Sequence, residues 1–218
     1  TVSVGLWLTA AELAPALHDR AALLSKDAWR TLVVLNRDIL VRTLALVTAF
    51  AVFTNLSAGL GTGVLAANAL ILRVQATAAW FIDGVAFATE THAGAMHGAG
   101  DTAGLRGLLR TAGWTSLAAA LAFGVPCAVA PKAVFGLLSS HPGLIEQAGA
   151  LAPWLLPVLV FGAPAFVLDG YFIGLTGGAV LRRAMLWSVL VGFVPLAVLA
   201  WWLSSPAVLW LAMTVFMA

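Results

Sequence analysis

The stretch "VLAANALILRVQATAAWFIDGVAFATETHAG", residues 64–94, decides the fold class because it is long, apolar and nearly free of charge. From residue 64 to residue 90 its only ionisable side chains are Arg73, Asp83 and Glu90. A helix needs about 20 predominantly apolar residues to cross the hydrocarbon core of a bilayer. We therefore expect residues 64–90 to form a membrane-spanning helix.

The remainder of the 218-residue chain has the same character. Hydrophobic residues make up 62% and charged residues 9% of the sequence, and the mean hydropathy is +1.02. Soluble domains have about 45–50% apolar and about 25% charged residues. The composition predicts an all-α, polytopic transmembrane helix bundle, with membrane lipid as its surroundings.

Several classes of protein are excluded by what the sequence lacks. Its single cysteine, Cys127, excludes an internal disulfide and a multi-cysteine metal site. We find no nucleophile elbow, no phosphate-binding glycine loop and no nucleic-acid-binding motif. We therefore expect neither an enzyme nor a nucleic-acid-binding protein, and neither a metal site nor an organic cofactor.

Glycine, proline and charged residues interrupt the chain at intervals of about one span. The expected spans are residues 39–58, 64–90, 108–130, 151–175 and 184–203, followed by a truncated one that begins at Pro206. These form a bundle over residues 39–218, and residues 1–13 are expected to end a preceding helix. Both ends of the sequence look like cuts through a longer chain.

Basic residues predict the orientation, because cytoplasmic loops retain Lys and Arg. The residues on one set of alternate loops are Arg20, Lys26, Arg30, Arg37, Arg42, Arg106, Arg110, Arg182 and Arg183. The opposite loops hold only Lys132. Residues 14–38, 92–107 and 176–183 are therefore expected in the cytoplasm. We interpret residues 14–38 as an interfacial amphipathic linker, unless its leucines begin the next helix early.

Four ionisable side chains are expected inside the spans, namely Arg73, Asp83, Glu90 and Asp169. Ionisable residues at membrane depth are functional candidates by default. Asp83 and Glu90 are two helical turns apart and so share a face. Glu90 lies near the cytoplasmic edge, where a solvated helix end is its simplest explanation.

Asp83 lies deeper than Glu90, and its ionised and protonated forms there have similar free-energy costs. Remaining ionised costs about 2.5–3.5 kcal/mol on insertion scales, and taking up a proton at pH 7 costs about 4 kcal/mol. This near-equality suits a proton-coupled switch. A static ion pair or hydrogen bonds to neighbouring helices are the structural alternatives.

Asp169 lies in "GAPAFVLDGYFIGLTGG", residues 162–178, a span interrupted by Pro164, Gly170 and Gly174. Prolines and glycines let a transmembrane helix bend or unwind near transporter binding sites. Asp169 is therefore our strongest candidate for a coupling-ion or substrate-cation site, and a carboxylate that caps a broken helix is the alternative. The weaker candidates for lining a cavity are Asn55, Asn68, Gln75, Tyr171, Arg73 and Glu90, although polar residues more often join helices together.

Three stretches carry a resemblance to a known family. "LNRDILVRTLALVTAF" (35–50), residues 64–94 and "DGYFIGLTGGAVLRRAM" (169–185) resemble the second half of multidrug and toxic compound extrusion (MATE) transporters, most closely their DNA-damage-inducible F branch. The resemblance implies the six-helix C-terminal lobe of a twelve-helix antiporter in the bacterial inner membrane. Its partner would be the N-terminal lobe, and its substrates would be bulky, often cationic or amphipathic compounds exchanged for protons or sodium ions.

The resemblance also bears on the coupling ion. Asp169 is similar to a helix-ten aspartate implicated in cation binding in some branches. Arg42 and Thr43 stand about where the sodium-coupled branch has a glutamate, which favours protons over sodium. The proton site proposed for the resembled branch lies in helix one, outside this chain.

Three alternatives to an antiporter remain open at this point. One is a lipid-linked oligosaccharide flippase of the same superfamily, for which Arg73 would supply cationic character. The others are a membrane scaffold and an inactive truncated half.

Overall fold

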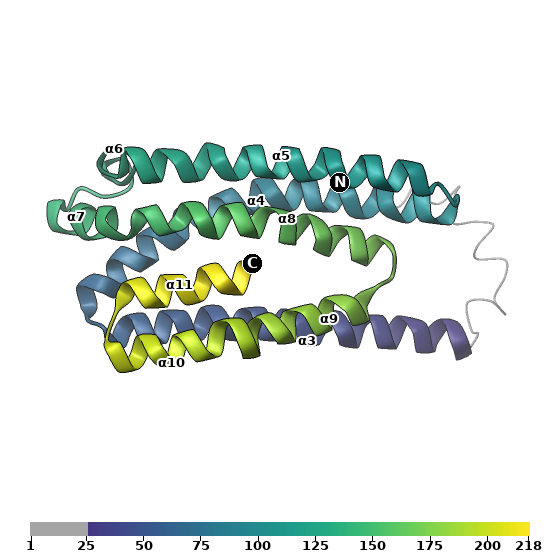
Figure 1. Cartoon of the computed structure of the whole chain (residues 1–218), viewed down its shortest axis with the longest axis horizontal. Coiled ribbons are helices and arrows are strands. Elements are labelled where there is room, and N and C mark those ends of the chain that lie inside the picture. Colours follow the sequence, from purple (N-terminus) through teal and green to yellow (C-terminus); the bar gives the residue numbers. More distant parts are fainter. Residues whose placement is uncertain (1–25) are drawn as a thin grey trace, which may run out of the picture.

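The computed structural model describes residues 26–218, which form a bundle of helices without strands (Figure 1). The helices are α3 (Lys26–Gly59), α4 (Thr62–Gly98), α5 (Thr102–Val129), α6 (Pro131–Gly136), α7 (Pro142–Leu151), α8 (Leu155–Gly174), α9 (Gly178–Trp187), α10 (Val194–Leu203) and α11 (Pro206–Met217). A 3-10 turn, η1 (Ala152–Trp154), precedes α8, and a π-helical segment, η2 (Ser188–Phe193), joins α9 to α10. The expected preceding helix at residues 1–13 and the first part of the expected linker lie outside the described residues.

The five expected spans are confirmed. Within the described residues, the helical segments long and apolar enough to cross a membrane are Asn36–Gly59, Thr62–Gly98, Thr102–Val129, Pro142–Gly174 and Gly178–Leu203. Pro206–Met217 is a shorter apolar helix. The breaks between spans fall at the glycine-, proline- and serine-rich positions that the sequence indicated. The chain is a multi-pass membrane protein.

Helix α3 differs from the expectation because it is already helical at Lys26 and continues without a break to Gly59. Residues 26–38 of the expected linker are thus continuous with the first span, which is the alternative that the sequence left open. The apolar span begins at Asn36 and so includes Arg37, Asp38 and Arg42. These three residues therefore belong to a segment long and apolar enough to cross a membrane, in addition to the four ionisable residues expected inside spans.

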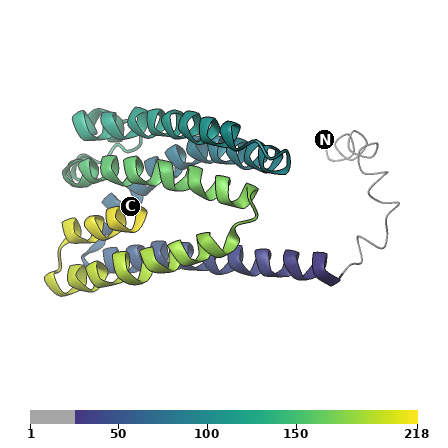
Figure 2. The same cartoon turned by 45° about the vertical axis from the view of Figure 1, so that its right-hand side comes forward.

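The helices form two layers, visible in both ribbon views (Figures 1 and 2). One layer consists of α4, α5 and α8, and the other of α3, α9, η2 and α10. Helix α11 packs against members of both layers. The chain passes from the first layer to the second through the turn between α8 and α9, at residues 175–177. This arrangement places α3 and α8 on opposite sides of the division.

Close packing of α4 against α8 corrects one interpretation of the sequence. A Cβ atom on Gly170 would collide with the backbone carbonyl of Ala86, and one on Gly174 would collide with that of Glu90. Small residues four positions apart let membrane helices approach each other this closely. Helix α8 continues through Pro164 to Gly174. The two glycines therefore serve helix packing and do not interrupt the span.

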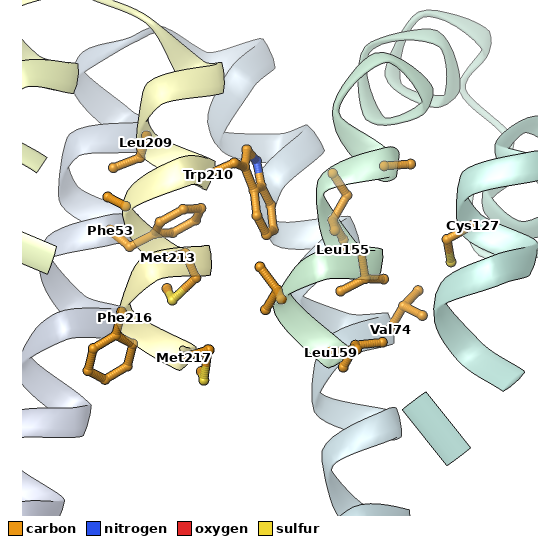
Figure 3. Close-up of a cluster of buried hydrophobic side chains, with 14 of the residues drawn as sticks. Phe53, Val74, Cys127, Leu155, Leu159, Leu209, Trp210, Met213, Phe216 and Met217 are labelled. Atoms are coloured by element: carbon orange, nitrogen blue, oxygen red, sulfur yellow. The ribbon is translucent and has the colours of Figure 1, made fainter. Parts of the chain in front are cut away.

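The apolar core lies around α11, where Trp210 lies between Phe53 on α3 and Leu155 on α8 (Figure 3). The rings of Phe53 and Trp210 meet edge to face with centroids 5.0 Å apart. Large apolar side chains also cover the outside, and Trp202 is 79% exposed. Apolar surface of this extent suits a lipid environment.

Candidate functional site

An ion pair between Arg42 and Asp169 joins the two layers. Arg42 Nε on α3 donates a hydrogen bond of 3.1 Å to Asp169 Oδ1 on α8, and Arg42 Nη2 contacts the second carboxylate oxygen. The side chains are 13% and 22% exposed, respectively. A guanidinium that engages both oxygens of a carboxylate makes a strong, directional contact. Apart from this ion pair, helices α3 and α8 pack little against each other. The ion pair is therefore the main contact between them.

Asp83 on α4 interacts electrostatically with Arg42, although the two side chains are not in ion-pair contact. Its half-buried side chain lies within electrostatic range of the Arg42 guanidinium. The charged cluster, defined as Arg42, Asp83 and Asp169, therefore combines one cation with two carboxylates. Its formal charge is −1 when all three groups are ionised, and one proton or monovalent cation would neutralise it.

A cavity of about 220 Å³ adjoins the ion pair. Arg42 and Asp169 form part of its wall, and Ser188 of the π-helical segment adds a hydroxyl. The other lining residues are Leu46, Ala165, Phe166, Leu168, Phe172, Val180, Leu181, Ala184, Met185, Phe216, Met217 and Ala218. Single π-helical turns within α-helices occur frequently at functional sites. The cavity is mostly apolar and has its charge at one side, as in binding sites for amphipathic molecules.

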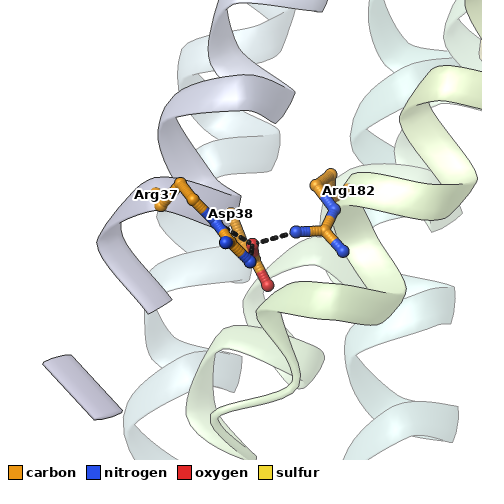
Figure 4. Close-up of polar contacts among 3 residues, drawn as sticks. All are labelled: Arg37, Asp38 and Arg182. Atoms are coloured by element: carbon orange, nitrogen blue, oxygen red, sulfur yellow. Dashed lines mark hydrogen bonds and ion pairs between the residues drawn. The ribbon is translucent and has the colours of Figure 1, made fainter. Parts of the chain in front are cut away.

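A second ion pair lies one turn away along α3 (Figure 4). Asp38, only 2% exposed, accepts hydrogen bonds from its neighbour Arg37 at 3.2 and 3.1 Å and contacts Arg182 of α9. This contact holds α3 and α9 together within one layer. Asp38 and Arg42, four residues apart, thus connect α3 to a helix of its own layer and to one of the other layer.

The opposite end of α3 is held by neutral groups. Asn68 Nδ2 on α4 donates to Ser57 Oγ at 2.8 Å, and Trp210 Nε1 on α11 donates to Asn68 Oδ1 at 2.9 Å. This neutral network, defined as Ser57, Asn68 and Trp210, connects three helices. Asn68 therefore joins helices, as polar residues in membrane bundles commonly do.

The other candidates from the sequence are dispersed. Glu90 is half-buried on α4 and has no ion pair with any side chain that the structure describes. Gln75 is buried, and its Oε1 has no hydrogen-bond partner in the part of the chain that the structure describes. Asn55 is exposed on α3, and Tyr171 packs edge to face against Phe172. Arg73 is exposed on α4 and lines a separate pocket.

Arg42 was used to predict topology and as a departure from the sodium-coupled pattern, Asp38 was not singled out, and the contacts of both residues were not predicted. A signal was present, because Asp38 and Arg42 are four residues apart and so lie on one helix face. The apolar run "ILVRTLALV", residues 39–47, surrounds Arg42 and places it inside the span. No pattern in the sequence indicated that Asp169, 127 positions later, would be its partner.

Comparison with known proteins gives two matches. The model of the MatE family matches residues 39–199 of this chain. The chain is also 36% identical over 197 residues to DNA damage-inducible protein F of Escherichia coli (strain K12). That alignment covers 88% of this chain and 42% of the relative, so the chain spans less than half of the relative's length.

Proposed function

The chain belongs to the MatE family of membrane transporters, which are not enzymes, and we propose that it forms the C-terminal lobe of a proton-coupled antiporter. The antiporter exports bulky, cationic or amphipathic compounds by alternating access across the bacterial inner membrane. One observation carries the proposal, namely the ion pair between Arg42 and Asp169 that ties the two layers beside a cavity. The N-terminal lobe of the same transporter is the partner of this bundle.

In this proposal the guanidinium of Arg42 takes the place of a bound cation at the carboxylate of Asp169. A proton that reaches Asp169 or Asp83 removes one of the two negative charges that hold the guanidinium. The tie between α3 and α8 then weakens, and the layers separate at this end. The neutral network at the other end of α3 carries no charge to titrate and keeps its hydrogen bonds.

The energies are sufficient for such a switch. Insertion scales assign about 2.5–3.5 kcal/mol to an unpaired charge at membrane depth. Moving one charge across the membrane potential supplies about 2.3 kcal/mol per 100 mV. The cost of breaking the pair is thus comparable to the energy that one proton brings, and neither term overwhelms the other.

The occupied carboxylate favours a proton over sodium as the coupling ion. Both oxygens of Asp169 already contact Arg42. Hard metal cations are held by several oxygen ligands at once, whereas a proton needs a single lone pair. Among the side chains that the structure describes, no group of three or more His, Cys, Asp or Glu residues could hold a metal ion.

The test is export by the full-length protein reconstituted in vesicles, with an imposed pH gradient and a fluorescent organic cation as substrate. We expect Asp169→Asn to abolish the dependence of export on the gradient, and Asp83→Asn to reduce it. Glu146→Gln is the matched control, because Glu146 is exposed on α7 and distant from the charged cluster in the fold. Unchanged gradient-dependent export in both aspartate variants would refute the coupling role.

A further inference from the structure

Arg73 occupies a position that the charged cluster does not explain. It lies eleven residues after the first residue of α4, about 16 Å along a helix that is long and apolar enough to cross a membrane. Its side chain is exposed and forms no ion pair with any carboxylate whose side chain the structure describes. A charge inside such a span is unfavourable unless water or an opposite charge meets it.

The Arg73 pocket lies between α3 and α4 and has a volume of about 360 Å³. Its polar lining consists of Arg73, Thr54, Ser57 and Asn68. Its apolar lining consists of Phe53, Leu65, Ala69, Leu72 and Ala76. No carboxylate lines it, and Asp83 is ten residues further along α4, at a distance of about 15 Å along the helix.

The hydrogen bonds of the lining residues show which chemistry the pocket can accept. The hydroxyls of Thr54 and Ser57 donate to backbone carbonyls one turn earlier, so their hydrogens are already used. Asn68 Nδ2 uses one hydrogen on Ser57 and keeps a second. Arg73 offers five N–H groups and a fixed positive charge. The available donors and the charge both favour an anion.

We propose that the Arg73 pocket binds the anionic group of an amphipathic molecule, such as a phosphate, carboxylate or sulfonate. The guanidinium of Arg73 holds that group, and the apolar wall formed by Phe53, Leu65 and Leu72 receives the adjoining hydrocarbon. This inference rests on the proposed transport function and extends its substrate class from cations to anionic and zwitterionic amphiphiles. The charged cluster is a separate site, lined by different residues.

The experiment measures equilibrium binding of dodecyl phosphate to the full-length protein in phosphatidylcholine nanodiscs. Dodecyltrimethylammonium and dodecanol serve as the cationic and neutral probes of equal chain length. We expect dodecyl phosphate to bind most tightly, and Arg73→Gln to weaken it about ten-fold or more, because a charge-assisted hydrogen bond is lost. Arg73→Lys, which keeps the charge, should retain part of the affinity.

Two further variants separate the pocket from general effects of charge. Arg183→Gln removes an exposed arginine of α9 that does not line the pocket, and we expect unchanged binding. Ala76→Phe fills the pocket without changing its charge, and we expect weakened binding of dodecyl phosphate. The inference is overturned if Arg73→Gln and Ala76→Phe both bind dodecyl phosphate like the unaltered protein, or if dodecanol binds equally well.

The source of the anionic group is distinguished by adding phosphatidylglycerol to the nanodiscs. Competition with dodecyl phosphate identifies a bilayer lipid as an occupant, and lack of competition identifies a free amphiphile; both outcomes support an anion site. Asp169→Asn should bind dodecyl phosphate normally. If this variant loses gradient-driven transport but still binds dodecyl phosphate, the anion site works independently of the coupling mechanism. If dodecyl phosphate does not bind even to the unaltered protein while transport remains gradient-driven, the anion site alone is refuted.

Discussion

Helix α3 has one charged and one neutral polar connection to helices outside its own layer, and that difference in charge separates a fixed connection from a switchable one. Near Gly59 the neutral network of Ser57, Asn68 and Trp210 is buried and its hydrogen bonds connect uncharged groups. Toward the other end the connection is the ion pair of Arg42 and Asp169, partly exposed beside a cavity. A proton or a cation can break the second connection and leaves the first unaffected. The comparison teaches that one helix can be held firmly at one end and conditionally at the other.

The neutral end can be broken by Asn68→Leu, for which we expect the largest loss of stability. The change leaves Trp210 Nε1 without its acceptor inside the core and removes the hydrogen bond to Ser57. We expect the free energy of unfolding to fall by about 1–3 kcal/mol, measured by thermal or denaturant unfolding in detergent. The loss should be equal at pH 5.5 and pH 8, because no charged group is involved.

Asn55→Leu is the matched control for this prediction. Asn55 lies on α3 near Ser57 but is exposed, so its replacement should change stability by less than about 0.5 kcal/mol. Equal losses in the two variants would show that the neutral network contributes nothing specific.

The charged end can be measured by a double-mutant cycle of Arg42→Gln and Asp169→Asn. Each single change leaves one charge of the pair without its partner, and the double change removes both. We expect a coupling energy of about 1 kcal/mol in unfolding experiments at pH 8. It should shrink under the conditions in which the proposed proton uptake by the charged cluster breaks the pair. A coupling energy that does not change with pH would show that the contact of α3 through Arg42 is no more switchable than the neutral network.

Glu90 provides the smallest expected effect and sharpens the contrast with Asp83. Both lie on one face of α4, but only Asp83 is within electrostatic range of Arg42. We expect Glu90→Gln to change stability by less than about 0.5 kcal/mol and to leave gradient-driven export unaltered. Export that is impaired as strongly as in Asp83→Asn would extend the charged cluster to Glu90.

The spans could be predicted from the sequence because their signal is local. Apolar runs of sufficient length, ended by Gly, Pro or Ser, specify a membrane helix without reference to the rest of the chain. Asp83 and Asp169 could also be singled out, because a carboxylate in such a run is exceptional wherever its partner lies.

The partners could not be predicted, because pairing depends on how the helices pack. Arg42 and Asp169 belong to different layers, and only the packed bundle brings them together. The role of Gly170 had the same ambiguity, since bending and close packing both favour glycine. The collision that a Cβ atom would make with Ala86 distinguishes the two roles, and it is visible only in three dimensions.

The central claim is that the tie between Arg42 and Asp169 opens during transport, and a distance across the two layers tests it directly. Spin labels at Leu44 on α3 and Thr91 on α4 would be exposed on opposite layers, with Cys127 replaced by alanine in the full-length protein. Double electron–electron resonance in vesicles should give two distance populations whose ratio changes between pH 8 and pH 5.5. With Asp169→Asn, we expect the separated population to dominate at both pH values. A single distance that neither pH nor Asp169→Asn alters would contradict the account.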